Sequence, residues 1–282
     1  MSQETLPLYH PTSLKVDQES SIFVMDWGDL RIKKYSSDGR SIGIVGKGKG
    51  RGPGEFMNPM HFDVAANGSI WVCDSETGRL SVFRPDGVLE KTIATTLIPS
   101  RVVALNAGNC IVLGQQGDEL FALLDGEGTI LRRFGTFVTD QIKNKLILDG
   151  WIARNGNDGF VYAPLYASIL AGYSLQGGEK FIVELVDPVP RPALAVTKQG
   201  VYIEPVTPLV TLSLNRPGQY VYLLSRSSSV GRDENVSIID AYNAENGKYV
   251  YSLKIPERSR EAYVTAQAVY TLADTSITVW NR

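Results

Sequence analysis

Residues 11 to 87 contain one pattern twice, with the second copy 48 positions after the first. A repeat of this length is typical of a solenoid or a propeller, because a single copy cannot bury its apolar face and needs a neighbour to cover it. The repeat therefore limits the chain to a fold of stacked or radially arranged units. The matching pairs are Pro11 and Pro59, Val16 and Val64, Ser21 and Ser69, Ile22 and Ile70, Val24 and Val72, Asp26 and Asp74, Arg31 and Arg79, Asp38 and Asp86, and Gly39 and Gly87.

Each copy is predicted to form four short antiparallel strands. In the second copy, turn residues such as Asn67-Gly68 and Asp86-Gly87 separate the apolar runs, and glycine is the residue that most easily adopts a positive φ. Four antiparallel strands in a unit of this size are typical of a propeller blade. The predicted strands are residues 61–65, 69–74, 79–84 and 88–93.

Less regular units follow. The third begins at Pro99, and the connector between the fourth and fifth is predicted at residues 187–208, because proline at this density does not suit a central strand. A short hairpin is predicted around Gln199-Gly200; the alternative is that residues 193–204 open a blade of their own. Residues 227–235 are predicted to be a polar loop within the fifth unit. The predicted strands are 151–154, 160–165, 169–174 and 180–186 in the fourth unit, and 210–214, 220–225, 237–242 and 248–255 in the fifth.

The C-terminal unit supplies only three predicted strands, at residues 262–265, 269–273 and 276–281. Residues 6–10 are the one unassigned strand-like run, so we expect an N-terminal strand to complete the last blade and close the ring. The predicted fold is all-β, a six-bladed β-propeller of four-stranded antiparallel blades in a single domain. The blades are placed at about residues 11–47, 58–94, 99–136, 147–186, 209–256 and 262–282 plus 5–10.

Composition excludes several classes of protein. The 282 residues carry a net charge of −2, which gives no global attraction to nucleic acid or acidic membranes. No apolar run approaches the ~20 residues that span a bilayer. Cys73 and Cys110 are the only cysteines, so a disulfide framework and a paired-cysteine metal site are excluded. The first eleven residues lack the features of a signal peptide; an exported context, with the targeting segment outside this sequence, stays open.

Three segments of the second unit resemble the NHL repeat: GPGEFMNP at residues 52–59, NGSIWVCD at 67–74 and RLSVF at 79–83. The resemblance covers residues 11–93 best, extends less well over 99–135, and is architectural beyond. It implies a six-bladed propeller. The later units lack the GEF motif and the Asp/Arg pair, so the resemblance does not extend to a function that needs uniform repeats.

The charged pairs Asp26/Arg31 and Asp74/Arg79 are interpreted as structural. A carboxylate that ends one strand and a guanidinium that opens the next can bridge the turn between them through charge-assisted hydrogen bonds. The spacing recurs with the repeat, which indicates a role in the scaffold. A ligand on the loop face is the alternative.

A glycine-rich basic stretch, residues 46–54, contains Lys47, Lys49 and Arg51. It is not a phosphate-binding P-loop, because neither the Lys-Ser/Thr ending nor a following helix is present. Some NHL propellers bind RNA on a basic surface, so RNA binding through blade one is one alternative function. The other interpretation is a connector whose glycines turn and whose lysines are solvated.

Enzymatic six-bladed propellers place their sites at the central channel, as metal-dependent lactonases and a peptide-amidating lyase do. Only His10 and His61 are present, so a site with several histidines is excluded. Asp63 and Asp149 are the candidate metal ligands; they could meet at a channel mouth and hold Ca²⁺ with carbonyls and water. No cofactor is predicted, with calcium as the alternative, and a metal-dependent hydrolase or lyase is the alternative function.

The preferred function is a non-catalytic binding or scaffold propeller that presents one loop face to a protein or peptide partner. Aligning the units places His61, Arg101 and Ile152 at one position, with Trp151 beside them. Tryptophan and arginine often anchor interfaces. The candidate partner-binding residues are His61, Arg101, Trp151, Arg154 and Trp27.

Overall fold

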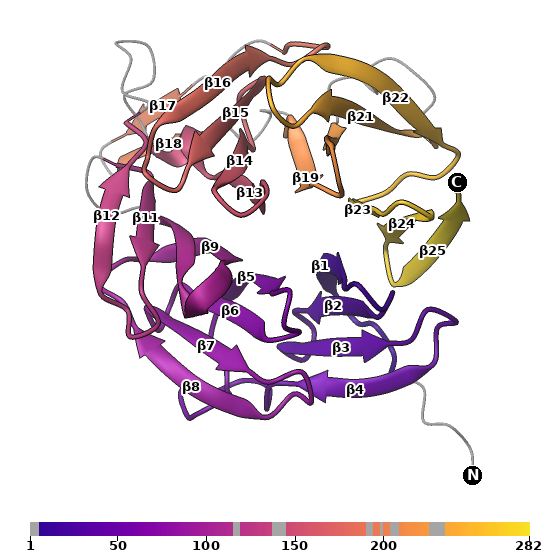
Figure 1. The fold of residues 1–282 in the computed structure, drawn as a ribbon. Coiled ribbons are helices and arrows are strands. Elements are labelled where there is room, and N and C mark those ends of the chain that lie inside the picture. Colours follow the sequence, from indigo (N-terminus) through magenta and orange to yellow (C-terminus); the bar gives the residue numbers. More distant parts are fainter. Residues whose placement is uncertain are drawn as a thin grey trace.

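The computed structural model describes residues 6–114, 119–136, 145–189, 194–197, 200–203, 209–225 and 235–282. Six antiparallel sheets stand around a central axis, and the first strand of each sheet lies nearest the axis (Figure 1). Neighbours in sequence are neighbours within each sheet. The six-bladed β-propeller predicted from the repeat is confirmed.

The first three blades have four strands each. Blade one contains β1 (Pro11–Val16), β2 (Ile22–Asp26), β3 (Arg31–Tyr35) and β4 (Ser41–Val45); blade two contains β5 (Pro59–Val64), β6 (Ile70–Asp74), β7 (Arg79–Phe83) and β8 (Leu89–Ala94); blade three contains β9 (Pro99–Ala104), β10 (Cys110–Gly114), β11 (Phe121–Leu124) and β12 (Ile130–Phe134).

Blades four and five also have four strands, and blade six has three. Blade four contains β13 (Gly150–Arg154), β14 (Gly159–Pro164), β15 (Ile169–Ser174) and β16 (Glu179–Glu184); blade five contains β19 (Thr211–Asn215), β20 (Tyr220–Ser225), β21 (Ser237–Asn243) and β22 (Tyr249–Ile255); blade six contains β23 (Glu261–Val264), β24 (Ala268–Ala273) and β25 (Ser276–Asn281).

Between blades four and five, β17 (Leu194–Thr197) and β18 (Gly200–Ile203) pair as a separate two-stranded antiparallel sheet. The predicted hairpin around Gln199-Gly200 thus has both its strands, while Gln199 lies outside the described residues. Most of the predicted polar loop at 227–235 also lies outside them. The two 3-10 helices are η1 (Asn106–Gly108) and η2 (Lys145–Leu148), and no helix of the described residues is long and apolar enough to cross a membrane.

The core lies between the blades, because each sheet turns both faces toward a neighbour. Second strands such as β6 and β10 are buried along their whole length, whereas outer strands such as β4 and β8 alternate between half-buried and exposed residues. The described residues form six apolar clusters, each between two adjacent blades. Burial between neighbours is what a repeat unit requires for stability.

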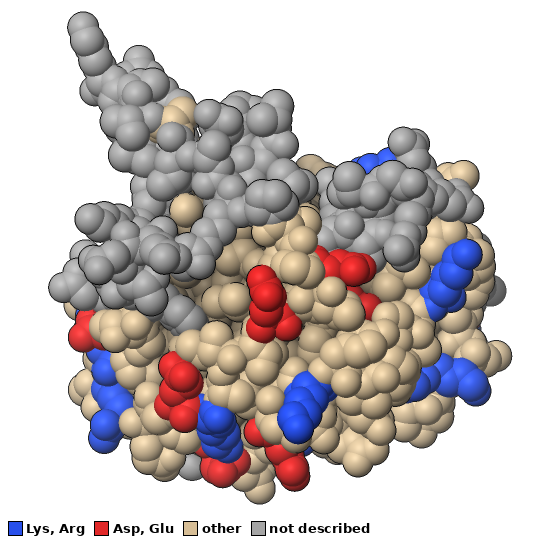
Figure 2. Space-filling model, turned by 90° about the horizontal axis from the view of Figure 1, so that it is seen from above, with Lys and Arg blue, Asp and Glu red and all other residues tan. Residues whose placement is uncertain are grey.

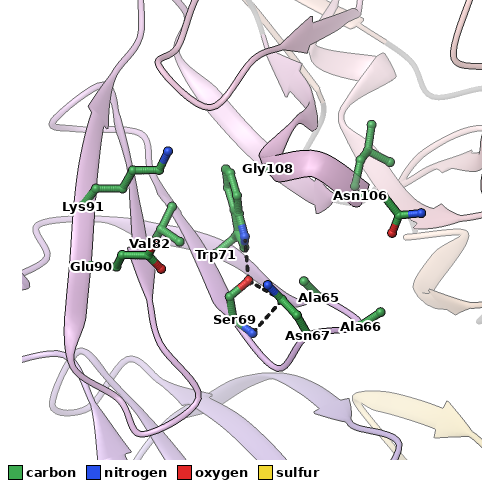
Figure 3. Close-up of a pocket in the computed structure, with 11 residues that line it drawn as sticks. Ala65, Ala66, Asn67, Ser69, Trp71, Val82, Glu90, Lys91, Asn106 and Gly108 are labelled. Atoms are coloured by element: carbon green, nitrogen blue, oxygen red, sulfur yellow. Dashed lines mark hydrogen bonds between the residues drawn. The ribbon is translucent and has the colours of Figure 1, made fainter.

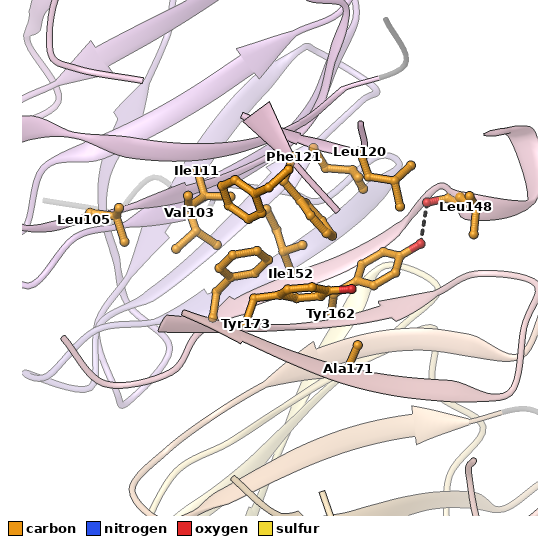
Figure 4. Close-up of a cluster of buried hydrophobic side chains, with 13 residues drawn as sticks. Val103, Leu105, Ile111, Leu120, Phe121, Leu148, Ile152, Tyr162, Ala171 and Tyr173 are labelled. Atoms are coloured by element: carbon orange, nitrogen blue, oxygen red, sulfur yellow. Dashed lines mark hydrogen bonds between the residues drawn. The ribbon is translucent and has the colours of Figure 1, made fainter. Parts of the chain in front are cut away.

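Aromatic side chains fill the cluster between blades three and four (Figure 4). The ring of Phe121 lies 4.9 Å from that of Phe160 and 5.1 Å from that of Tyr162, both edge to face. Such pairs add about 0.5–1.5 kcal/mol each beyond the burial of apolar area. The buried Tyr162 hydroxyl donates a 2.6 Å hydrogen bond to the Leu148 carbonyl, so its polar end is satisfied.

The N-terminal segment departs from the prediction, because described residues 6–10 contain no strand and do not complete blade six. The segment instead binds blade one. The Asp26 carboxylate accepts the Tyr9 and His10 amides, each at 2.7 Å, and the Lys33 ammonium donates to the Pro7 carbonyl. Leu6 and Leu8 pack against the apolar cluster between blades six and one, so the segment covers the seam of the ring through side chains.

The 48-residue repeat explains this difference. Asp74 accepts the amides of Met57 and Asn58, which lie as far before Asp74 as Tyr9 and His10 lie before Asp26. Residues 9 and 10 therefore occupy the position of a connector that leads into a blade. Because this connector is held by an aspartate side chain, its amides are not available to form a sheet ladder with β25.

Candidate functional site

The inner strands of neighbouring blades are joined by polar side chains. The Asp63 carboxylate accepts the Ala104 amide at 2.9 Å, and His61 Nδ1 accepts the Val102 amide at 3.4 Å. Asn215 donates to the Val264 carbonyl at 2.7 Å and accepts the Val264 amide at 3.2 Å. Buried backbone groups need such partners, so part of the polarity along the channel serves to connect the blades.

Three of the predicted binding residues meet in one buried cluster. The Arg101 Cζ atom lies 4.7 Å from the centroid of the Trp151 ring, and the His61 ring lies 5.8 Å from it. Asp149 completes the cluster, with its Oδ2 3.6 Å from Arg101 Nη2. His61 is 0% exposed and Arg101 5%, so these two side chains are closed to a protein partner, whereas Trp151 and Asp149 are half-buried.

The cluster shows that the sequence alignment was wrong by one residue in blade four. The last residues before the loops that lead to the second strands are Val64, Ala104 and Arg154. Counting back three residues gives His61, Arg101 and Trp151, not Ile152. The count is the same in all three blades, because the register shifts in the pairing of β5 with β6 and of β9 with β10 lie before His61 and Arg101.

Burial determines the protonation of the His61 ring. Burial is the main cause that holds the pKa of His61 well below its ordinary value, and the nearby Lys15 and Arg101 charges lower that pKa further. His61 is therefore neutral at pH 7. Its Nε2 atom, Arg101 Nε and Trp151 Nε1 are buried without hydrogen-bond partners among the described residues.

Arg154 and Trp27 lie apart from this cluster. Arg154 lies at the other end of the channel. There its Nη2 donates to the side-chain oxygens of Asn106 and Asn157 at 2.9 and 2.8 Å. Trp27 follows β2; it is 37% exposed and donates a 2.8 Å hydrogen bond from Nε1 to the Pro59 carbonyl. The five predicted residues therefore do not form one site.

Asp63 and Asp149 do not meet. The Val102 amide donates to His61, and two residues further along both strands the Ala104 amide donates to Asp63. The inner strands β5 and β9 therefore run in the same direction. Asp63 is near the end of its inner strand, whereas Asp149 precedes its own. Within the described residues, no group of three or more His, Cys, Asp or Glu side chains could hold a metal ion. Asp63 and Asp149 therefore do not form the pair of ligands that the alternative calcium site requires.

The Asp/Arg pairs do not bridge the turn as expected. Asp74 accepts the Met57 amide at 2.7 Å and the Thr77 amide at 3.0 Å. The Arg79 guanidinium donates to the carbonyls of Arg51, Gly52 and Glu55 at 2.8, 3.0 and 2.5 Å. In blade one Asp26 pairs with Lys33 rather than Arg31. These side chains bind the connectors that lead into the blades.

Replacing Arg79 with methionine is expected to lower the free energy of unfolding by about 1–3 kcal/mol, since it removes three charge-assisted bonds to connector carbonyls. Urea unfolding measures this loss, and amide exchange should rise in residues 51–56. The exposed Arg84, replaced by methionine, is the matched control and should change neither. Equal stability of the Arg79→Met variant and the parent would show that the connector folds without these bonds.

The basic stretch forms a compact connector. The Lys47 amide donates to the Gly54 carbonyl at 2.8 Å and the Phe56 amide to the Gly48 carbonyl at 2.9 Å. Gly48 has a φ of 91°, which side-chain-bearing residues rarely adopt. Lys47, Lys49 and Arg51 are exposed, and Arg51 pairs with Glu76 at 2.7 Å.

Several cavities lie at the other end of the channel, on the face formed by the loops between the first and second strands of the blades. We call it the inner-turn face, and all six of its loops are among the described residues. They are residues 17–21, 65–69, 105–109, 155–158, 216–219 and 265–267.

Three cavities adjoin on this face. One of about 700 Å³ lies at the channel mouth and is lined by Gln18, Asn67, Arg154 and Arg216. Another of about 430 Å³ lies between blades two and three beside Trp71, whose Nε1 donates to Ser69 (Figure 3). A third, of about 110 Å³, shares the residues Ala65, Arg154 and Arg216 with the first.

Sequence reasoning missed this face. Arg216 is absent from the predicted site, although Arg216-Pro217-Gly218 has turn chemistry directly after a predicted inner strand. That position was the available signal, because it places a charged side chain at a channel mouth. The register error in blade four also hid the different environments of Trp151 and Arg154.

Comparison of the sequence with protein-family models and with curated proteins finds no match. The NHL resemblance therefore rests on its motifs. Solved structures share the fold. The chain is similar to virginiamycin B lyase from Staphylococcus aureus, with a TM-score of 0.61, 12% identity and 98% of each chain covered.

Two further structures are comparably similar. A putative exported protein from Bacteroides fragilis has a TM-score of 0.63 and 11% identity, over 100% of this chain and 92% of that one. Hydrazine synthase from Kuenenia stuttgartiensis has a TM-score of 0.60 and 10% identity, over 100% and 99%. At this level of identity the similarity shows the propeller fold and no shared activity.

Proposed function

We propose that this propeller is a binding module that takes a protein or peptide partner on its inner-turn face. The observation that carries the proposal is the group of three adjoining cavities around the loop of residues 65–69. The largest, at about 700 Å³, is within the usual size range of ligand pockets. Polar side chains and backbone groups of several blades line it, as recognition of a peptide requires.

The surroundings of the other candidate sites favour this face. His61 and Arg101 are buried, so a substrate or partner has no direct contact with these two side chains. On the side of the molecule seen in Figure 2, basic and acidic side chains are interspersed, which does not favour a nucleic-acid surface. The inner-turn face combines open volume with fixed walls.

A displayed library of random peptides, selected on the immobilised protein, tests the proposal. Enriched peptides are expected to compete with one another for one site. Replacing exposed Ala66, which borders two of the cavities, with tryptophan should weaken them at least about tenfold by filling that volume.

The matched control is Thr275→Trp, in the turn between β24 and β25 at the opposite end of the strands. It should leave binding unchanged. Peptides that bind Ala66→Trp as well as they bind the parent would place recognition elsewhere and overturn the proposal.

A further inference from the structure

The smallest of the three cavities concentrates positive charge. About 110 Å³ in volume, it is lined by Lys15, Arg154 and Arg216, with Asp63 as its one carboxylate. It opens into the large cavity, since Arg154, Arg216 and Tyr263 line both. A group that enters from the inner-turn face therefore meets three cationic side chains at the base of the recognition surface.

Two of these cations form no direct ion pair. Within the described residues, Lys15 Nζ and the Arg216 guanidinium make no hydrogen bond and no ion pair, and Arg216 Nε is buried. Lys15 is only 6% exposed. Burying an ammonium without a partner costs free energy. Because folding has already removed water from Lys15, an anionic ligand that pairs with it does not have to desolvate this side chain.

The nearby carboxyl groups act on these cations without forming ion pairs with them: Asp63 and Glu261 act on Lys15, and Glu245 acts on Arg216. Arg154 bonds only to neutral acceptors, the side chains of Asn106 and Asn157 and the Gly156 carbonyl. Asp63 is committed to the Ala104 amide, and burial raises its pKa, although Lys15 and Arg154 act in the opposite direction. Burial likewise lowers the pKa of Arg216, as expected for a desolvated cation.

We propose that Lys15, Arg154 and Arg216 form a binding site for a carboxylate group, presented by an aspartate, a glutamate or the C-terminus of a peptide that lies on the inner-turn face. The source of the carboxylate rests on the proposed function. The volume equals that of about three or four water molecules, which suits a carboxylate at the end of a side chain. Arginine provides planar donors for such a group and lysine a point charge.

Titration of the ¹⁵N-labelled protein with sodium acetate, against sodium chloride at equal ionic strength, tests the site without any peptide. The Arg216 Nε–H resonance and the Ala65 and Asn215 amides should shift and reach saturation with acetate alone. Lys15→Met and Arg216→Gln should each weaken acetate binding by about tenfold, because each removes one charged hydrogen bond.

Arg84→Gln, a change to an exposed arginine, is the control and should bind acetate as the parent does. The peptide arm uses the enriched peptides with each carboxylate changed to an amide. A tenfold or greater loss for one such change, absent in the Arg216→Gln protein, is the expected result.

The two proposals fail in different ways. Peptides that bind the inner-turn face but are unaffected by loss of every carboxylate would overturn the anion site and leave the binding module intact. Saturable acetate binding with no enriched peptide would support the anion site and count against the peptide partner. Shifts that are linear and equal in acetate and chloride would overturn the site itself.

Discussion

Replacing Asp26 with asparagine is expected to lower the free energy of unfolding by about 3 kcal/mol or more, because it removes one partner of a buried ion pair. The Lys33 ammonium lies 2.6 Å from Asp26 Oδ2, and the Lys33 residue is 1% exposed. Asp29, at 3.2 Å, gives Lys33 a second and more exposed carboxylate. This second partner places the expected loss at the lower end of the range for broken buried pairs.

The same carboxylate holds the N-terminal segment, so a second effect is expected. Asp26 accepts the amides of Tyr9, His10 and Gly28, and an asparagine oxygen accepts them less strongly because it carries no charge. Protease cleavage near residues 6–10 should therefore accelerate in the variant. An intact segment in a destabilised variant would show that the apolar contacts of Leu6 and Leu8 hold it without Asp26.

A double-mutant cycle separates the ion pair from the other contacts. Lys33→Met and Asp26→Asn together should cost less than the sum of the two single changes, because neither leaves the other's charge unpaired. Chemical unfolding measures all three variants. The exposed Asp38, which pairs with Arg40 on the surface, is the control; its change to asparagine should have little effect. Additive losses would contradict the coupling.

The pH dependence of this contribution has a definite sign. Burial opposes ionisation of Asp26, but the Lys33 ammonium and three backbone amides together hold its pKa below the ordinary 3.8. A lowered pKa in the folded state means stability that is present above 3.8 and is lost as the pH falls through the folded pKa. The difference between the parent and Asp26→Asn should shrink in that acidic range.

The repeat predicts the architecture well because it records local chemistry. The predicted strands at 169–174 and 220–225 coincide with β15 and β20. This is because the alternation of apolar and polar residues and the turn residues that bound a strand lie within a few positions of one another. The repeat also marks Asp26 and Asp74 as structural. It does not predict which backbone groups they bind, because those groups lie in connectors that the fold brings back to them.

The site could not be predicted to the same extent. The pairing of β13 with β14 places Trp151, three residues before Arg154, at the position of His61 and Arg101, and no residue in the sequence marks this register. The cavities depend on how loops of different blades converge, as Asn67 and Arg216 do at the channel mouth. The packing of different blades around the ring determines this convergence, and the sequence of a single repeat unit does not predict it.

Glu261 is expected to make the protein less stable as the pH rises. This side chain lies at the seam of the ring, where its Oε2 accepts the Leu14 amide of blade one at 2.9 Å. Burial raises the pKa of Glu261 to about 8, from an ordinary 4.5, although Lys15 and Arg101 act to lower it. The folded protein therefore keeps a proton on this carboxyl at pH values where the unfolded chain has released it.

The sign follows from the raised pKa. Below pH 4.5 both states hold the proton and the group costs nothing; between 4.5 and about 8 the folded state becomes progressively less stable; above 8 the loss is complete. The full loss has an upper limit of about 5 kcal/mol, from the conversion of pKa shifts into free energy.

Glu261→Gln removes the titration while it keeps an oxygen that accepts the Leu14 amide. The unfolding free energies of parent and variant, measured from pH 4 to pH 9, should diverge with rising pH in favour of the variant. Glu127→Gln, at an exposed glutamate, should follow the parent throughout. A constant difference between parent and Glu261→Gln would mean that Glu261 is ionised in the folded ring.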